Sequence, residues 1–245
     1  MTVLDLDGVT FGYGPTPAVE DVSVSVSDGE FLGVVGPNGS GKSTLLALML
    51  GLREPDAGSV RLFGEPAHSF SDGTRVGYVA QDVRESATDM PITVREVVLM
   101  GRYPHVGFGR LRERDRTATR EALERVGIAD LADRRIGRLS GGQRQRAFIA
   151  RALAGDADLL ALDEPAVGVD AESREAFYDL LSALHADGLT VVLVDHDLGV
   201  VSERAETVAC LNRRLRYYGD PAEFRESDTI ARVYGARPQV SGTTP

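Results

Sequence analysis

The sequence predicts an α/β fold with a mainly parallel sheet, an N-terminal antiparallel β subdomain and an inserted α-helical subdomain. Predominantly apolar runs, such as residues 159–162 and 190–194, are typical of strands buried on both faces of a parallel sheet. Near the N-terminus the apolar residues alternate instead, as in antiparallel strands with one buried face. From about residue 82 to residue 155 the apolar spacing is helical, and no strand is expected there.

The length of 245 residues suits one α/β domain with an insertion, which we place at residues 1–238, and we expect residues 239–245 to fray. The sequence contains no apolar run of about 18 residues and no basic region followed by an apolar one, so we expect neither a membrane span nor a signal peptide. The single cysteine, Cys210, lies in an apolar run, which favours a buried structural role over redox or metal chemistry.

The first elements are two alternating segments, residues 3–9 and 22–26, which predict antiparallel strands. The link between them, FGYGPTP, is rich in turn-forming residues and carries Tyr13. An aromatic ring in this position could pack locally, or it could stack on a nucleotide base.

The next segment, GPNGSGKST at residues 36–44, fits the phosphate-binding pattern G-x-x-x-x-G-K-[ST]. Residues 30–35 before it predict a buried strand, and residues 45–50 after it predict a helix. Glycines let the backbone curl so that successive N–H groups face one anion, and the helix N-terminus adds positive potential. The segment therefore predicts a P-loop NTPase core, in which Lys42 reaches the β- and γ-phosphates and Ser43 ligates Mg²⁺.

A turn over residues 51–58 and a strand over residues 59–63 follow the expected helix. The next apolar run, residues 76–80, ends at Gln81. A glutamine in this position could simply cap a turn. At the carboxyl edge of a parallel sheet it could also face a ligand.

The inserted block has helical spacing at residues 93–100 and 112–126. Between them lies MGRYPHVGFGR, residues 100–110, which is rich in glycine and aromatic residues and contains Pro104. We expect this segment to be too broken for a helix, and it is unusually apolar for a surface loop. Its aromatic residues, Tyr103 and Phe108, therefore either pack on their own domain or dock on a partner.

The five residues LSGGQ, 139–143, directly precede a helix expected over residues 144–154. Ser140 is a suitable N-cap for that helix. The two glycines could instead form a second nest of backbone N–H groups for an anion.

The apolar strand at residues 159–162 delivers Asp163 and Glu164 at its end. Because side chains alternate along a strand, the two carboxylates point in different directions, so one could lie near Mg²⁺ and the other near an attacking water. The strand at residues 190–194 ends in Asp195-His196-Asp197, for which a solvated turn is the ordinary interpretation. A short helix is expected at residues 229–234.

These motifs, in this order, resemble the nucleotide-binding subunit of an ATP-binding cassette (ABC) transporter over nearly the whole chain. The resemblance depends on Tyr13, the phosphate loop, Gln81, LSGGQ, LLALDEP and His196, and LSGGQ is the family's own signature. It implies ATP and Mg²⁺ as cofactors. The loop residues that would hold the phosphates and Mg²⁺ are Gly36, Asn38, Gly39, Ser40, Gly41, Lys42, Ser43 and Thr44.

The resemblance also implies individual roles outside the loop. Tyr13 would stack on adenine, and Asp163 would support Mg²⁺. Glu164 would be the general base that polarises water. Gln81 would contact Mg²⁺ and water, and His196 would contact the γ-phosphate.

In this family LSGGQ faces the nucleotide of the other subunit. Ser140, Gly141, Gly142 and Gln143 therefore imply a head-to-tail homodimer with two ATP molecules at the interface. The family's usual loop after the acidic pair reads SALD, whereas this chain has Ala166-Val167-Gly168-Val169-Asp170. Asp170 keeps its place, and the contact that the missing serine would make across the dimer stays open.

The strings DEPAVGVDAES, VDHDL and LNRRLRYYGDPAEF look most like subunits that energise uptake of zinc, manganese or iron(II). This resemblance implies an integral-membrane permease, an extracytoplasmic substrate-binding protein, and a peripheral position on the cytoplasmic face of the membrane. The alternatives are an importer of siderophores, haem or cobalamin, and a soluble ABC ATPase without a transport role. The chain lacks a coiled-coil insertion and a second cassette, which disfavours the soluble class.

The charge is acidic, with a formal net charge of −10 from 37 acidic and 27 basic residues. This balance argues against a nucleic-acid partner, which needs a concentrated basic face. Of the 27 basic residues only Lys42, in the phosphate loop, is a lysine. An acidic surface poor in lysine resembles that of salt-adapted proteins; a genome rich in arginine codons would explain the arginines but not the excess of Asp and Glu.

A salt-adapted surface makes a direct prediction. The melting temperature should rise between low and molar salt, because screening shortens the range of repulsion among the excess carboxylates from ~10 Å at 0.1 M to ~3 Å at 1 M. Thermal unfolding in a series of NaCl concentrations tests this. A melting temperature that stays constant or falls over the series would contradict salt adaptation.

Overall fold

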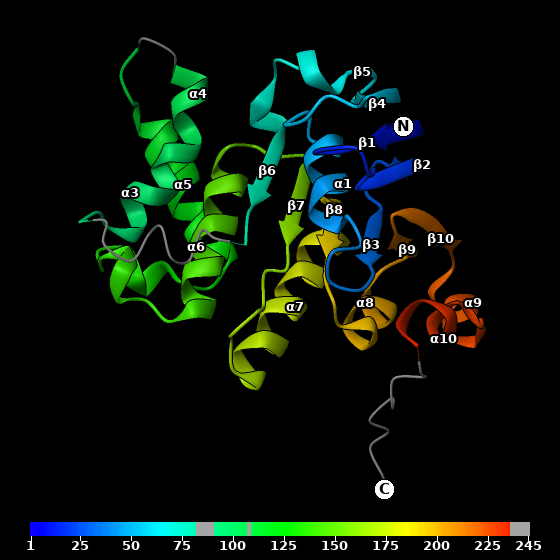
Figure 1. The fold of residues 1–245 in the computed structure, drawn as a ribbon. Coiled ribbons are helices and arrows are strands. Elements are labelled where there is room, and N and C mark those ends of the chain that lie inside the picture. The colour runs from blue at the N-terminus through cyan, green and yellow to red at the C-terminus, as the bar shows by residue number, and fades with distance from the viewer. Residues whose placement is uncertain (82–90, 107–108, 236–245) are drawn as a thin grey trace, which may run out of the picture. The chain divides into compact units, whose positions relative to one another are not determined.

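The computed structural model describes residues 1–81, 91–106 and 109–235 (Figure 1). The chain forms two compact units. The first unit contains residues 1–70 and the chain from residue 192 onward, and the second contains residues 71–191.

An antiparallel sheet in the order β2-β1-β4-β5 opens the first unit. Its strands are β1 (Thr2–Phe11), β2 (Val19–Ser27), β4 (Ala57–Leu62) and β5 (Glu65–Pro66), and β1 pairs with both β2 and β4. In β2 the valines at 22, 24 and 26 are buried while the residues between them are exposed. The predicted antiparallel subdomain with one buried face is therefore confirmed, and β5 is an addition to it.

The first unit also holds the strands next to the phosphate loop. β3 (Phe31–Val35) is wholly buried and pairs in parallel with β9 (Thr207–Asn212), which pairs antiparallel with β10 (Arg214–Gly219). On its other side β3 neighbours β8 (Thr190–Val194), of which residues 192–194 belong to this unit. Burial raises the pKa of the Cys210 thiol on β9 to about 11, so the thiol stays protonated at neutral pH, as its predicted structural role requires.

Among the described residues, the first unit contains four α-helices. α1 (Lys42–Met49) follows the phosphate loop, α8 (Leu198–Arg204) packs on β3, and α9 (Pro221–Glu226) and α10 (Thr229–Tyr234) come last. The packing of α8 on β3 depends on a glycine, because a Cβ on Gly33 would lie 2.1 Å from Cγ1 of Val201. The predicted helix at residues 229–234 is α10, and its prediction is confirmed.

The second unit combines strands and helices. β6 (Val76–Val79) pairs in parallel with β7 (Leu159–Asp163), and α7 (Ala171–Ala186) follows β7 in the chain. The helical part contains α3 (Val94–Leu99), α4 (Tyr103–Val106), α5 (Glu113–Arg125) and α6 (Gly141–Ala154). Figure 1 shows α5 and α6 side by side, in green. The predicted helices at residues 93–100 and 112–126 are thus confirmed, while residues 82–90 lie outside the described part of the chain.

One prediction was wrong. Residues 100–106 are not irregular: they form a 3₁₀ turn (Met100–Arg102) that runs into the single turn α4. Pro104 lies in the first turn of α4, where the fixed φ angle of proline suits a helical backbone. Gly101 lets this segment approach the end of α6, since a Cβ there would lie 2.1 Å from the carbonyl oxygen of Arg151. Phe108, predicted with Tyr103 to pack or dock, lies outside the described residues.

In the described ranges, none of the helices is long and apolar enough to cross a membrane.

Candidate functional site

The phosphate loop leaves β3 at Gly36 and enters α1 at Lys42. Gly39 and Gly41 have φ angles of 75° and 98°, which favour glycine. Neither Gly36 nor Gly41 has room for a side chain, because a Cβ would lie 2.2 Å from the carbonyl oxygen of Leu211 and 2.4 Å from that of Ala18, respectively. The tight curl predicted for the loop is therefore present, and main-chain carbonyls from other segments border it.

Three features of the loop fit a bound phosphate group. The N-terminus of α1 has no side-chain cap and no acidic residue in its first turn, so neither a capping side chain nor a carboxylate of that turn competes with an anion there. The Lys42 side chain is buried and donates to the carbonyl oxygens of Gly36 at 3.0 Å and Pro37 at 3.4 Å. In the described residues Oγ of Ser40 is buried without a hydrogen-bond partner. A phosphate would offer acceptors to all of these groups.

The remaining loop residues differ in exposure. Asn38, Gly39 and Ser43 are exposed, and Thr44 is half-buried. Ser43 is the second residue of α1, so its hydroxyl leaves the first helical turn, where a ligand for a phosphate-bound cation is needed.

Tyr13 is 67% exposed, although its ring has local contacts. Its ring meets Phe11 edge to face at 5.1 Å, and the guanidinium carbon of Arg53 lies 5.8 Å from its centroid. A base that stacks on Tyr13 must therefore use the opposite face or displace Arg53. Arg53 was missed in the sequence because no local signal connects it with Tyr13.

His196 follows β8, the neighbour of β3 in the sheet, so it leaves the first unit's sheet beside the strand that ends in the phosphate loop. Its side chain is 58% exposed. The turn is held by Asp195, whose Oδ1 accepts from the backbone N–H groups of His196 at 2.7 Å and Asp197 at 3.0 Å. Asp197 in turn caps α8, so the backbone around His196 is fixed while its ring stays accessible.

The acidic pair and Gln81 belong to the second unit. Val79 of β6 pairs with Leu162 of β7 in parallel register, so Gln81 and Glu164 leave the same edge of these two strands. Asp163 is buried, at 5% exposure, whereas Glu164 is half-buried and Gln81 is exposed. The two carboxylates thus have different exposure, but strand alternation is not the cause, because β7 ends at Asp163 and Glu164 lies after it.

The backbone at Glu164 is unusual. Its φ angle is 44°, a left-handed value that is rare for a residue with a side chain and costs about 1–3 kcal/mol. Such strain collects at functional sites, where it holds a side chain in a required direction. The left-handed φ angle of Glu164 ends the extended backbone of the strand immediately after Asp163.

The LSGGQ segment begins α6 three residues before the predicted start at Arg144. Ser140 and Gln143 form a reciprocal capping box: Ser140 Oγ accepts from the Gln143 N–H at 3.3 Å, and Gln143 Oε1 accepts from the Ser140 N–H at 3.1 Å. Gly141 is half-buried and Gly142 is buried, where a Cβ would lie 3.3 Å from Cβ of Ser173. The capping interpretation of Ser140 is therefore correct. The nest of backbone N–H groups at Gly141 and Gly142 stays a prediction.

Asp170 caps α7 by accepting the N–H of Ser173 at 2.9 Å. This hydrogen bond lowers the pKa of Asp170. The stabilising effect of the carboxylate is therefore present above its unfolded-state pKa and is lost as the pH falls through the lowered value. The cap fixes Asp170 at the start of the helix that follows the AVGVD loop.

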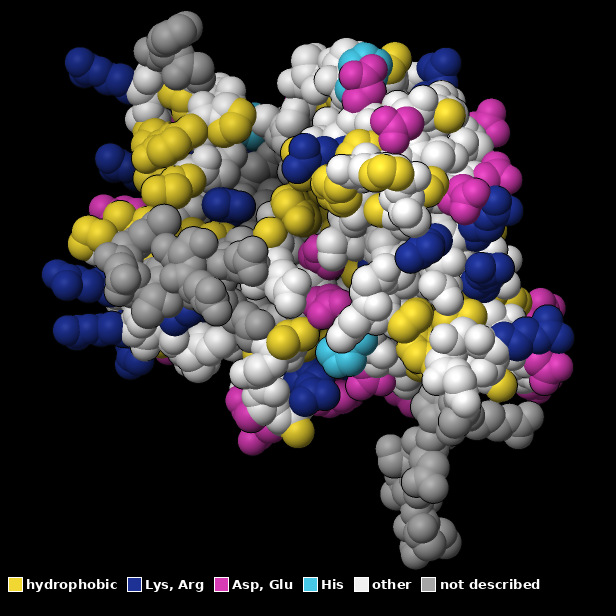
Figure 2. All heavy atoms as spheres, in the orientation of Figure 1, with side chains coloured by type: hydrophobic (Ala, Val, Ile, Leu, Met, Phe, Trp, Pro, Cys, Tyr) yellow, Lys and Arg dark blue, Asp and Glu magenta, His cyan; other side chains and the backbone are white. Residues whose placement is uncertain are grey.

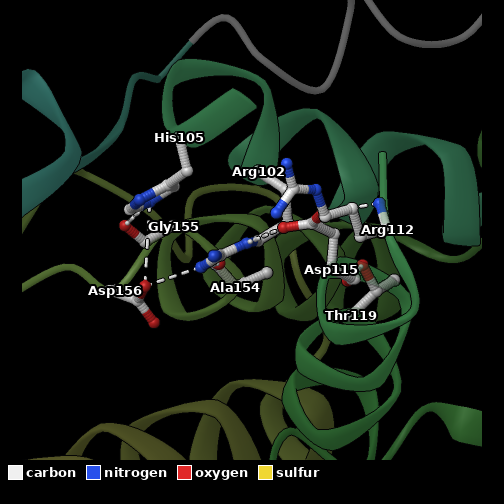
Figure 3. Close-up of polar contacts among 8 residues, drawn as sticks. All are labelled: Arg102, His105, Arg112, Asp115, Thr119, Ala154, Gly155 and Asp156. Atoms are coloured by element: carbon white, nitrogen blue, oxygen red, sulfur yellow. Dashed lines mark hydrogen bonds and ion pairs between the residues drawn. The ribbon is translucent and has the colours of Figure 1, made fainter. Parts of the chain in front are cut away.

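A buried ion pair in the helical part was not foreseen from the sequence (Figure 3). Nε of Arg102 lies 3.2 Å from Oδ1 of Asp115, and Nη1 of the same guanidinium lies 2.6 Å from Oδ2 of Asp156 and donates to the carbonyl oxygen of Ala154 at 2.8 Å. The N–H of Arg112 and the guanidinium of Arg102 lower the pKa of Asp115. No sequence signal marks Asp115, because it lies in a helix full of charges.

Comparison with known proteins decides the family. Residues 19–167 match the model of the ABC transporter family. The chain belongs to the ABC transporter family. It binds ATP or ADP and hydrolyses ATP.

This ABC subunit resembles several curated proteins along most of its length. It is 42% identical over 225 residues to the zinc uptake system ATP-binding protein ZurA of Listeria innocua, with 91% of this chain and 88% of that protein covered. It is 39% identical over 240 residues to the manganese transport system ATP-binding protein MntB of Bacillus subtilis, with 97% and 94% covered. A dimeric post-hydrolysis structure of the ATP-binding cassette MJ0796 with ADP and Pi has a TM-score of 0.74 and 28% identity, covering 89% and 98%.

The geometry of Lys42 generates a prediction for the phosphate site. Lys42→Ala should weaken ADP binding about 10- to 100-fold, because it removes a charge-assisted hydrogen bond from a buried position. Isothermal titration calorimetry with ADP measures the affinity. Arg61→Ala, an exposed cation on β4, is a control that should bind ADP normally. Unchanged ADP affinity and ATP turnover in Lys42→Ala would contradict the assignment of the phosphate loop.

Proposed function

We propose that this chain is the ATPase subunit of an importer of a divalent metal ion, such as zinc or manganese. The observation that supports the proposal most strongly is the similarity to zinc and manganese uptake subunits over more than nine tenths of the chain. Iron(II) belongs to the same chemical class of cargo. An importer of siderophores, haem or cobalamin is the second candidate, and the GRYPH string at residues 101–105 does not separate the two, because it resembles importers of metal chelates and of metals alike.

The proposed catalytic roles follow the sequence motifs. The N–H groups of residues 39–42 and the Lys42 ammonium bind the phosphates, and His196 contacts the γ-phosphate. Glu164 accepts a proton from the attacking water, with Gln81 orienting that water. Tyr13 stacks on the adenine.

Mg²⁺ fits the donors that the chain supplies. Ser43 offers a hydroxyl, Asp163 a buried carboxylate and Gln81 an amide oxygen. In the described residues there is no cluster of three or more His, Cys, Asp or Glu that could hold a metal by itself. None is needed, because Mg²⁺ in nucleotide sites takes most of its ligands from phosphates and water. When bound, Mg²⁺ neutralises charge that develops on the phosphate oxygens.

The chain is proposed to act as a head-to-tail homodimer with two ATP molecules at the interface. The support is the dimeric MJ0796 cassette together with the complete LSGGQ segment. In this arrangement Ser140, Gly141, Gly142 and Gln143 of one copy face the nucleotide of the other, and the capping box holds them in place before closure. Asp170, fixed as the cap of α7, lies in the AVGVD loop that would approach the same interface.

Glu164→Gln should hydrolyse ATP about 10²- to 10⁴-fold more slowly, because the amide keeps the shape of the side chain but cannot accept a proton. ATP should then trap the dimer. Phosphate release and multi-angle light scattering with ATP and Mg²⁺ measure both effects, and Glu121→Gln, an exposed carboxylate on α5, is the matched control. If Glu164→Gln hydrolyses ATP at the normal rate and stays monomeric with ATP, both the assignment of Glu164 as the base and the proposed dimer are wrong.

A docking surface for the permease is proposed around α4. Met100 and Tyr103 are 38% and 52% exposed, and Pro104 beside them is exposed. Figure 2 shows hydrophobic side chains gathered on the surface around α4. Exposed aromatic residues are enriched at the centres of protein interfaces. Tyr103 therefore supports docking over inward packing, and this contact would place the subunit on the cytoplasmic face of the membrane.

The Arg102 ion pair gives this surface a rigid base (Figure 3). Arg102 joins the turn before α4 to the start of α5 through Asp115 and to the end of α6 through Ala154. His105 of α4 adds a contact, with Nε2 at 2.9 Å from the carbonyl oxygen of Gly155. Removing one member of a buried pair costs about 3–5 kcal/mol, so substitution of Arg102 would disturb folding as well as docking. Tyr103 is the better probe.

Cells that lack their own subunit for this importer provide the test. The wild-type chain, expressed with its permease, should restore accumulation of zinc or manganese, measured by mass spectrometry. Tyr103→Ser should lose recruitment to the membrane about 30-fold, the effect of a central interface residue worth 2 kcal/mol, and should fail to restore uptake. Its soluble ATPase activity and melting temperature should stay those of the wild type.

The control is Leu52→Ser, another exposed apolar residue, which should leave recruitment unchanged. Normal uptake by Tyr103→Ser would exclude the docking role. If the wild type restored uptake of ferric chelates but of no free divalent ion, the second candidate would replace the first.

A further inference from the structure

The turn between β9 and β10 lies directly against the phosphate loop. The backbone N–H of Arg213, in this turn, donates to the carbonyl oxygen of Ser40 at 2.9 Å. At the other end of the loop, a Cβ on Gly36 would lie 2.2 Å from the carbonyl oxygen of Leu211. The hairpin turn therefore contacts the phosphate loop at both ends of its curl.

Arg213 adopts a backbone conformation that few residues with side chains accept. Its φ angle is 57°, in the left-handed region, which costs roughly 1–2 kcal/mol. The side chain is exposed, so burial of the guanidinium does not explain the choice. The left-handed angle instead directs the N–H of Arg213 toward Ser40 and closes the hairpin between Asn212 and Arg214.

The other side of the same residue is tied to β2. The carbonyl oxygen of Arg213 accepts the N–H of Glu20 at 2.8 Å. Nη2 of Arg214 lies 2.5 Å from Oε1 of Glu20, and this contact lowers the pKa of the carboxyl group. Two residues before Glu20, the carbonyl oxygen of Ala18 borders Gly41, where a Cβ would lie 2.4 Å away. The phosphate loop is thus enclosed by the hairpin and by the start of β2.

The bond to Ser40 has a geometric consequence for the next residue. A trans peptide is planar, so the carbonyl of Ser40 and the N–H of Gly41 point in opposite directions in one rigid unit. Fixing the carbonyl toward Arg213 therefore fixes the N–H of Gly41 toward the inside of the loop. Gly41 is the residue before α1 and has a φ angle of 98°, so no side-chain preference of its own would hold this orientation.

We propose that Arg213 is a positioning residue for nucleotide binding, acting through its main chain: its N–H holds the Ser40 carbonyl and so aims the Gly41 N–H at the phosphates. This inference rests on the proposed phosphate site. It assigns a role to the left-handed residue of the β9–β10 hairpin, far along the chain from the phosphate loop. The guanidinium group has no part in it, and the variants below separate the main chain from the side chain.

Two variants of the full chain make the main test. Arg213→Pro removes the N–H and cannot reach a positive φ angle, so it should weaken ADP binding at least tenfold and raise the KM for ATP more than it lowers kcat. Arg213→Gly loses the side chain but keeps the N–H and accepts φ near 57° without strain, so it should restore ADP affinity to within about twofold of the wild type. ADP affinity is measured by calorimetry and KM by phosphate release.

A third variant keeps the test valid if Arg213→Pro does not fold. Arg213→Val keeps the N–H but resists the left-handed angle, so its ADP affinity should fall between those of Gly and Pro. Leu62→Ala, a core change on β4, supplies a loss of thermal stability at a distance from the hairpin and should leave ADP affinity unchanged.

The outcomes are distinct. The inference is overturned if Arg213→Pro and Arg213→Val melt earlier but bind ADP like the wild type, because the hairpin would then be structural only. It is also overturned if Arg213→Gly binds as weakly as Arg213→Pro, because the side chain would then be responsible. Lys42→Ala distinguishes failure of the Arg213 role from failure of the proposed phosphate site. Normal ADP binding in that variant would show that the phosphate site is wrongly assigned.

Discussion

The first unit depends on one constraint: uncharged backbone N–H groups have to be aimed at a highly charged ligand. Residues 36–41 meet it by a curl that leaves no room for side chains at Gly36 and Gly41. The groups that border the curl are the main-chain carbonyls of Leu211 and Ala18. Because main-chain atoms pack directly on main-chain atoms here, the loop has little freedom to adjust. We therefore expect it to have the same shape without a bound nucleotide. The strand β3 that leads into the loop is wholly buried.

Features with a local cause were predictable from the sequence. The strand–loop–helix of the phosphate site follows from apolar residues, glycines and Lys42 in immediate succession. The antiparallel strands follow from a period of two in residues 22–26, and the N-cap role of Ser140 follows from its residue type, although α6 begins three residues before the predicted start at Arg144. Each of these signals lies within a few residues of the structure that it specifies.

Features that depend on distant partners were not predictable. Residues 100–106 contain Gly101 and Pro104 and so suggest an irregular segment, yet they form helical turns because Arg102 binds Asp156, 54 residues away, and Gly101 fits against α6. The left-handed φ angle of Glu164 occurs at a residue other than glycine, so the sequence gives no local sign of it. Arg213 also has a left-handed φ angle without being glycine, so its sequence gives no local sign of the turn. Tertiary contacts override local preference at all these residues.

The two helix N-termini that face nucleotide in the proposed dimer are prepared in opposite ways. α1 has no side-chain cap, so a bound phosphate can take the place of a capping side chain. α6 is already capped by Ser140 and Gln143, so its N-terminus is ordered in the single chain. A helix end without a side-chain cap gains most from an anionic ligand, whereas an ordered surface loses little entropy when it closes on a ligand held by another copy. This difference favours an order of events in which nucleotide binds at α1 first and the second subunit then closes over it.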